Sequence, residues 1–281
     1  MKNVLLMEGS NLPARERAAL FGHETTGEVY ARALLAEDAA LHIDVLYGAD
    51  EGAEPPRPLA SYDGFVISGS ALHAYDAIPD VTRQIDWVRR VGDLGLPILG
   101  SCWGLQICAV AGGGTVERNS AHAEMGVARK IVPTAAGRDH PLLAGRKDVF
   151  DAPCIHYDHV ARLPEGSVVL AGNSRCPVQA AIIPIGNSVA WGVQYHPEFD
   201  LPHLAEIYED YGDKMVGTPF FDSREVLDSH IADLRAAANA APDAAVVWRL
   251  GIDSDLIDGQ IRRTELRNWL RAARRSSQAG Q

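Results

Sequence analysis

One short segment in the first half of the chain constrains the fold more than any other. An apolar run leads into Gly-Ser-Cys-Trp-Gly at residues 100–104, and a helix-compatible run follows at 105–110. This order predicts a strand, a sharp turn at Cys102 and then a helix. A nucleophile on such a turn needs small neighbours two residues away, because side chains at Gly100 and Gly104 would collide with adjacent elements.

Cys102 allows two interpretations at this point. At the start of a helix, the helix dipole and unpaired N–H groups favour the thiolate over the thiol, which suits a nucleophile. A buried structural cysteine at a strand end would fit the segment equally well. The rest of the chain has to decide between them.

Composition and length narrow the class of protein. The chain has 281 residues, of which 47% are hydrophobic, and this suits a packed globular protein. Its net charge of -11 argues against a nucleic-acid-binding or anionic-membrane surface. The apolar run at residues 4–7 is too short for a signal peptide, and no segment reaches the length of a membrane span. Four cysteines without Cys-x-x-Cys spacing predict neither a disulfide framework nor a zinc knuckle, so we expect a cytoplasmic protein.

Strand-like and helix-like runs alternate through the first hundred residues. The strand-like runs are 4–7, 41–47 and 62–67, and the helix-like runs are 16–21, 27–38 and 79–94. This alternation predicts βαβ units and a mostly parallel sheet.

The second half of the chain changes character twice. Short β-type runs at 113–132, 149–159 and 168–194 predict antiparallel strands added to one side, a β-rich flank. A helix is expected at 201–214. From residue 216 a helical extension follows, with helices at 223–239 and 264–274 and a disordered end from 274.

A second motif, Tyr-His-Pro-Glu-Phe, stands at residues 195–199 after a strand expected at 188–195. Residues two apart in an extended segment point the same way, so His196 and Glu198 would face one side. A base oriented by a carboxylate and facing a cysteine is the general form of a nucleophilic triad. Alone, the motif is weak, because a helix-capping His-Pro turn with a surface glutamate is the commoner explanation. Together with Cys102, it favours the nucleophilic site.

These motifs resemble those of the class I (triad-type) glutamine amidotransferase domains, a family related to γ-glutamyl hydrolases. The matching segments are 100–106, 192–198 and the turn at 67–70. The resemblance covers residues 1–215, and leaves 216–281 as the helical C-terminal extension. It implies an α/β fold, a three-layer αβα sandwich with a mostly parallel sheet and a β-rich flank.

The resemblance also implies roles for individual residues. Cys102 would attack the side-chain amide carbon of glutamine and form a γ-glutamyl thioester. His196 would act as base and then as acid toward the departing ammonia, and Glu198 would orient it. The backbone N–H groups of Ser70 and Trp103 would form the oxyanion hole.

The remaining implied contacts hold the amino-acid end of the substrate. They would come from Gly69, Gln106, His156 and Tyr157. The chain departs from the family pattern where Ser70 replaces a glycine, and where Tyr157 replaces the glycine of a Ser-His-Gly-Asp-type segment. Because a tyrosine would reshape the substrate mouth, we expect the specificity to differ from that for plain glutamine. The resemblance implies no cofactor and no metal.

Other side chains have simpler interpretations. Cys108 is expected in the core. Cys154, His156 and His159 lie close in sequence, but no fourth ligand at a recognised spacing supports a metal site.

Two further pairs are expected to serve structure. His122 and Glu124 are interpreted as a solvated polar pair, and Asp253 with Asp255 as residues at a helix boundary. Trp248 and Trp269 are expected to pack within the tail.

Three functions follow. The first is a glutaminase that makes ammonia for a synthetase on a separate partner chain. The second is a stand-alone hydrolase of γ-glutamyl amides or peptides, and the third is a regulatory protein with a relict site. Both enzymes would act on a small-molecule substrate.

Overall fold

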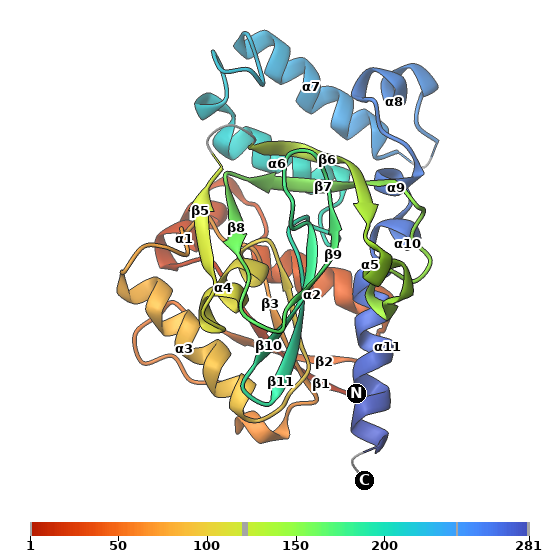
Figure 1. The fold of residues 1–281 in the computed structure, drawn as a ribbon. Coiled ribbons are helices and arrows are strands. Elements are labelled where there is room, and N and C mark those ends of the chain that lie inside the picture. The colour runs from red at the N-terminus through yellow and green to blue at the C-terminus, as the bar shows by residue number, and fades with distance from the viewer. Residues whose placement is uncertain (1, 120–122, 240, 280–281) are drawn as a thin grey trace.

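The computed structural model describes residues 2–119, 123–239 and 241–279 (Figure 1). Their main feature is a nine-stranded sheet of order β2-β1-β3-β4-β11-β10-β9-β6-β7. Its parallel part comprises β1 (Asn3–Met7), β2 (His42–Leu46), β3 (Gly64–Ile67), β4 (Ile98–Ser101) and β11 (Ser188–Val193). The antiparallel part comprises β10 (Ala180–Ile185), β9 (Val168–Gly172), β6 (Glu124–Pro133) and β7 (Phe150–His156). It forms the expected β-rich flank, and β5 (Thr115–Arg118) pairs separately with β8 (Asp158–Arg162).

Helices cover both faces of the sheet, which confirms the predicted three layers. Alternate residues of β1 point to opposite faces. Leu5 belongs to a hydrophobic cluster with α3 (Pro79–Asp93) and α4 (Trp103–Ala111). Leu6 belongs to a second cluster with α2 (Thr26–Glu37) and α11 (Thr264–Ala279). Continuous apolar strands are buried on both faces for this reason.

The register of the parallel strands brings their carboxyl ends to one edge. Met7 of β1 lies opposite Ile67 of β3, and Ser101 of β4 lies opposite Val193 of β11. Residues that follow these strands therefore meet at one edge, where open α/β sheets bind their ligands.

The remaining helices lie around this sheet. They are α1 (Leu12–Phe21), α5 (Ala135–Asp139), α6 (Leu201–Tyr211), α7 (Arg224–Ala237), α8 (Ala244–Leu250), α9 (Ser254–Ile257) and α10 (Gly259–Arg262), with 3-10 turns η1 (Leu59–Ser61), η2 (Pro141–Leu143) and η3 (Gly212–Lys214). A third cluster joins α6, α7 and α8. Asp253 caps α9 and accepts a hydrogen bond from Asp255 N, which confirms the predicted helix boundary. Within the described residues, no helix combines the length and apolarity that a membrane span requires.

Two expectations for the tail are corrected. Trp269 is buried on α11, but Trp248 on α8 is 81% exposed and does not pack within the tail. The helix α11 continues to Ala279, so residues 274–279 are helical rather than disordered, and 280–281 lie outside the described residues.

Candidate active site

The backbone at Cys102 forms the predicted sharp turn between β4 and α4. Cys102 has φ 51° and ψ −99°, a strained conformation for a residue other than glycine. A Cβ on Gly100 would lie 2.5 Å from the carbonyl carbon of Gly104, and a Cβ on Gly104 would lie 2.8 Å from Ile67 O. Both glycines are therefore required by close packing, as the sequence predicted.

The surroundings of Cys102 favour the neutral thiol over the thiolate. Burial raises its pKa, the nearby Glu198 carboxylate raises it further, and the N–H of Trp103 lowers it. The sulfur donates to the carbonyl oxygen of Ile155, with 3.7 Å between Sγ and O. Burial and the Glu198 carboxylate therefore act against the thiolate that the helix N-terminus is expected to favour.

His196 and Glu198 face each other after β11. The Nδ1–H of His196 donates to Glu198 Oε1 over 2.7 Å, and both residues are 2% exposed. This hydrogen bond fixes the tautomer and leaves Nε2 free to accept a proton. The residues meet through a turn, in which Phe199 N donates to His196 O, and not through the extended segment expected from their spacing. The imidazole also stacks on the Phe199 ring at 3.8 Å between centroids.

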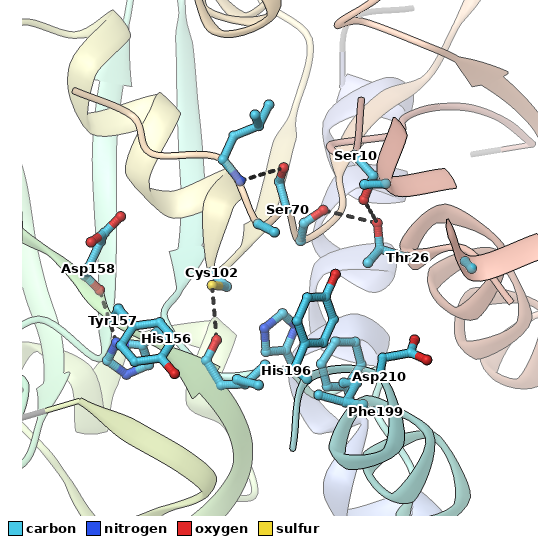
Figure 2. A pocket seen from close by; sticks show the side chains of 18 of the residues that line it. Ser10, Thr26, Ser70, Cys102, His156, Tyr157, Asp158, His196, Phe199 and Asp210 are labelled. Atoms are coloured by element: carbon cyan, nitrogen blue, oxygen red, sulfur yellow. Dashed lines mark hydrogen bonds between the residues drawn. The ribbon is translucent and has the colours of Figure 1, made fainter. Parts of the chain in front are cut away.

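Gly69 and Ser70 form the wall beside His196. A Cβ on Gly69 would lie 2.8 Å from His196 Cε1, so only glycine fits there. The Ser70 hydroxyl accepts from Leu72 N over 3.2 Å, and Ser70 lines the same cavity as Cys102 (Figure 2). The predicted pair of Ser70 and Trp103 is thus placed at the ends of two neighbouring strands.

A buried carboxylate behind this wall was not singled out from the sequence. Glu8, at the end of β1, is 1% exposed and accepts from Ser10 N and Gly27 N. Thr26 Oγ1 lies 2.5 Å from Glu8 Oε1 and 3.0 Å from the carbonyl oxygen of Gly69. Glu8 therefore ties the Gly69–Ser70 peptide to α2. Its one signal in the sequence is an acidic residue directly after a buried strand.

Two residues predicted to contact substrate, His156 and Gln106, also form hydrogen bonds within the chain. Both ring nitrogens of His156 face acceptors within the chain, Asp158 O at 2.9 Å and Glu124 Oε2 at 3.0 Å. Gln106 Nε2 donates to Asp158 O and Gln194 Oε1. These side chains line the cavity, but their nitrogens hold the 155–158 segment in place.

Glu124 is buried, which corrects its assignment as a solvated residue; His122 lies outside the described residues. Ligating atoms of Glu124, His156 and Cys176 lie within 4.8 Å of one another. Of the three residues considered as metal ligands from the sequence, only His156 belongs to this group, and Cys154 and His159 do not. Asn173 and Gln179 also donate to the Glu124 carboxylate, at 2.7 and 2.6 Å. Hydrogen bonds within the chain therefore account for this cluster.

A cavity of about 570 Å³ opens over Cys102. In Figure 2, His156, Tyr157 and Asp158 lie on one side of Cys102, and Ser70, Thr26 and Asp210 lie on the other. Its wall includes residues that the sequence did not single out: Arg17 of α1, Arg118 of β5, and Ile207, Tyr211 and Lys214 from α6 and η3. These come from distant segments, so no local motif reveals them.

Comparison with known families identifies the family of this chain. Residues 28–210 match the model of the family described as glutamine amidotransferase class-I. The chain belongs to this family. Members of this family are enzymes. The relatives of this chain include a hydrolase and a glutamine-hydrolyzing synthase subunit.

Two curated relatives show this breadth. A γ-glutamyl-L-1-hydroxyisopropylamide hydrolase of a Pseudomonas species is 32% identical over 239 residues, covering 83% of this chain and 80% of that protein. One of the glutamine-hydrolyzing GMP synthase subunits, from Methanoculleus marisnigri, is 41% identical over 106 residues, covering 38% of this chain and 54% of that protein.

Solved structures support the class I amidotransferase fold over almost the whole chain. A glutamine amidotransferase of Thermotoga maritima superposes with a TM-score of 0.65 at 18% identity, over 97% of each chain. A glutamine amidotransferase of Methylobacillus flagellatus gives 0.62 at 18% identity, over 96% of this chain and 94% of that one.

Proposed function

We propose that the chain hydrolyses γ-glutamyl amides to glutamate and an amine, without a synthetase partner. The observation that carries this proposal is the cavity over Cys102. At about 570 Å³ it lies within the range of about 300–1,000 Å³ that suits ligands larger than one amino acid. A γ-glutamyl amide with a substantial amine would fill it better than glutamine does.

The site residues have defined roles in this reaction. His196 Nε2 takes the thiol proton as Cys102 attacks the γ-carbonyl carbon, and Glu198 stabilises the imidazolium. The N–H groups of Ser70 and Trp103 bind the oxyanion, each contributing about 3 kcal/mol to lowering the barrier. The imidazolium then protonates the departing amine, which leaves a γ-glutamyl thioester on Cys102.

The second half of the reaction reverses these proton transfers. His196 takes a proton from water, and the resulting hydroxide attacks the thioester carbonyl. The carbon–sulfur bond breaks, the thiolate regains the proton, and glutamate leaves. The neutral thiol, which burial favours over the thiolate, is the form that this cycle starts from and returns to.

The γ-glutamyl-L-1-hydroxyisopropylamide hydrolase of the Pseudomonas species favours the same reaction. A γ-glutamyl amide hydrolase aligned over 83% of the chain extends beyond the segment that matches the family model. A second candidate is a glutaminase that supplies ammonia to a synthetase, which the GMP synthase relatives favour. The alignments cover 54% and 33% of two of these proteins.

The test is glutamate release by the purified chain from L-glutamine and from γ-glutamyl amides of ethylamine and of a small amino alcohol. We expect a higher kcat/KM for an amide than for glutamine. Cys102→Ala should abolish turnover, and Cys108→Ala on the same helix should keep it, because that thiol is packed in the core.

Two results would overturn the stand-alone hydrolase. One is a clear preference for glutamine over every amide. The other is absence of turnover while Cys102 still reacts with a glutamine-like electrophile, the result expected of a glutaminase that needs its partner.

A further inference from the structure

Two arginine–tyrosine pairs line the cavity. Arg118 lies over the ring of Tyr157, with 5.5 Å from Cζ to the ring centre, and Arg17 lies over Tyr211 at 5.4 Å. All four side chains belong to the cavity wall. The pairs come from different elements, so they meet different parts of any bound molecule.

We propose that Arg118, supported by Tyr157, binds the α-carboxylate of the γ-glutamyl substrate. This inference rests on the proposed function and assigns one end of that substrate. The α-carboxylate is the one anionic group shared by all γ-glutamyl amides. A site for it fixes the glutamyl half while the amine half can vary.

The pairing of β5 with β8 positions this arginine. Arg118 lies opposite Asp158, and the next residue, Asn119, donates its N–H to Tyr157 O over 2.7 Å. The Arg118 backbone is therefore fixed beside the segment that passes Cys102.

The spacing from the nucleophile suits a glutamyl group. Ile155 O lies 3.7 Å from the sulfur of Cys102. Tyr157 follows two residues later, which corresponds to about 7 Å of extended chain. An extended glutamyl group spans four carbon–carbon bonds, roughly 5 Å from its γ-carbonyl carbon to its α-carboxyl carbon, and therefore fits within this length.

The positive charge of the Arg118 guanidinium is not neutralised by an ion pair with a described residue. Among the residues that the structure describes, no carboxylate forms an ion pair with Arg118. Its cross-strand neighbour Asp158 is occupied, since His73 Nδ1 lies 2.6 Å from one oxygen and Tyr75 donates to the other. By contrast, Arg15 in the same wall is paired with Asp50 at 2.6 Å.

The chemistry of the pair fits a carboxylate. A guanidinium presents two parallel N–H groups to a carboxylate, and an aromatic face beneath it restricts its orientation. Tyr157, which replaces the family glycine, therefore supports the Arg118 guanidinium through its ring face.

The test compares two substrates in four proteins, the wild type and three variants. The substrates are γ-glutamyl-p-nitroanilide and the same compound with its α-carboxylate replaced by a neutral carboxamide. We expect Arg118→Gln to lower kcat/KM for the acid about 10- to 100-fold, mainly through KM, and to leave the carboxamide nearly unchanged. Arg118→Lys should retain part of the preference, because it keeps the charge without the fork.

Arg17→Gln is the matched control, since Arg17 is also exposed, lines the cavity and lies on a tyrosine. It should keep the wild-type preference for the acid. The carboxylate site would be refuted if Arg118→Gln kept the preference for the acid over the carboxamide, or if Arg17→Gln lost it. Either result would leave the proposed function standing. If the wild type hydrolysed neither compound, the proposed function and the site would fail together.

Discussion

Cys102 combines a strained backbone with a protected thiol. Its side chain lines the cavity although it is only 5% exposed, and burial and the Glu198 carboxylate raise the pKa of its thiol. A permanent thiolate would react with many electrophiles. The neutral thiol becomes nucleophilic only when His196 takes its proton, so reactivity depends on a bound carbonyl group.

The raised pKa of this thiol predicts its pH dependence. Because the thiolate forms only as pH rises toward a raised pKa, alkylation of Cys102 by iodoacetamide should still accelerate up to pH 9 without a plateau. Glu198→Gln removes one cause of the raised pKa, so it should increase the rate at any given pH in this range. The measurement is the rate of labelling of the peptide that contains Cys102. A plateau below pH 7 would show a thiolate already present.

The roles of some single residues can be predicted from the sequence, and the roles of others cannot. Gly100 and Gly104 are predictable, because their close packing follows from the turn itself. Glu8 and Arg118 are not, because each acts through a partner far away in sequence. A motif reports local geometry, whereas these contacts depend on the assembled sheet.

At the scale of elements, helix α11 joins the tail to the hydrophobic cluster on one face of the sheet. Trp269 lies in the same hydrophobic cluster as Val4 and Leu6 of β1. The buried Glu265 forms an ion pair with Arg146 at 2.7 Å and accepts from Tyr195 OH at 2.8 Å. These contacts favour a single cooperative unit, which argues against folding of residues 1–215 alone.

A pair of tryptophan variants tests this. Trp269→Ala should lower the free energy of unfolding by about 3–5 kcal/mol, because it removes a large buried side chain. Trp248→Ala, which removes an exposed side chain of the same tail, should change it by less than about 0.5 kcal/mol. Urea unfolding of both variants makes the comparison. If Trp269→Ala were as mild as Trp248→Ala, α11 would be an appendage.

Element types are largely predictable from the sequence, and their exact geometry is not. Alternating apolar and helical runs predict β1 to α4, because buried parallel strands and amphipathic helices have distinct patterns. The same reasoning predicts an extended segment at residues 196–199, where the structure has a turn, since Pro197 fits both conformations. Only the hydrogen bond from Phe199 N to His196 O distinguishes them.

At the scale of the whole molecule, the sheet explains why the site lies where it does. Parallel strands bring Glu8, Gly69, Cys102 and His196 to one edge, although they are spread over nearly two hundred residues. The fold class was predictable because the motifs and the alternation agreed. The outer wall of the cavity was not, because α1, which contributes Arg17, has no buried residue and so carries no apolar pattern to place it.

The central claim is that hydrolysis passes through a glutamyl thioester on Cys102. Partitioning with hydroxylamine tests this most directly, because hydroxylamine competes with water for a thioester. During turnover of a γ-glutamyl amide, added hydroxylamine should divert product from glutamate to γ-glutamyl hydroxamate, while the amine is still released at least as fast. Cys102→Ala should give neither product. Continued release of glutamate alone, at every hydroxylamine concentration, would contradict the account.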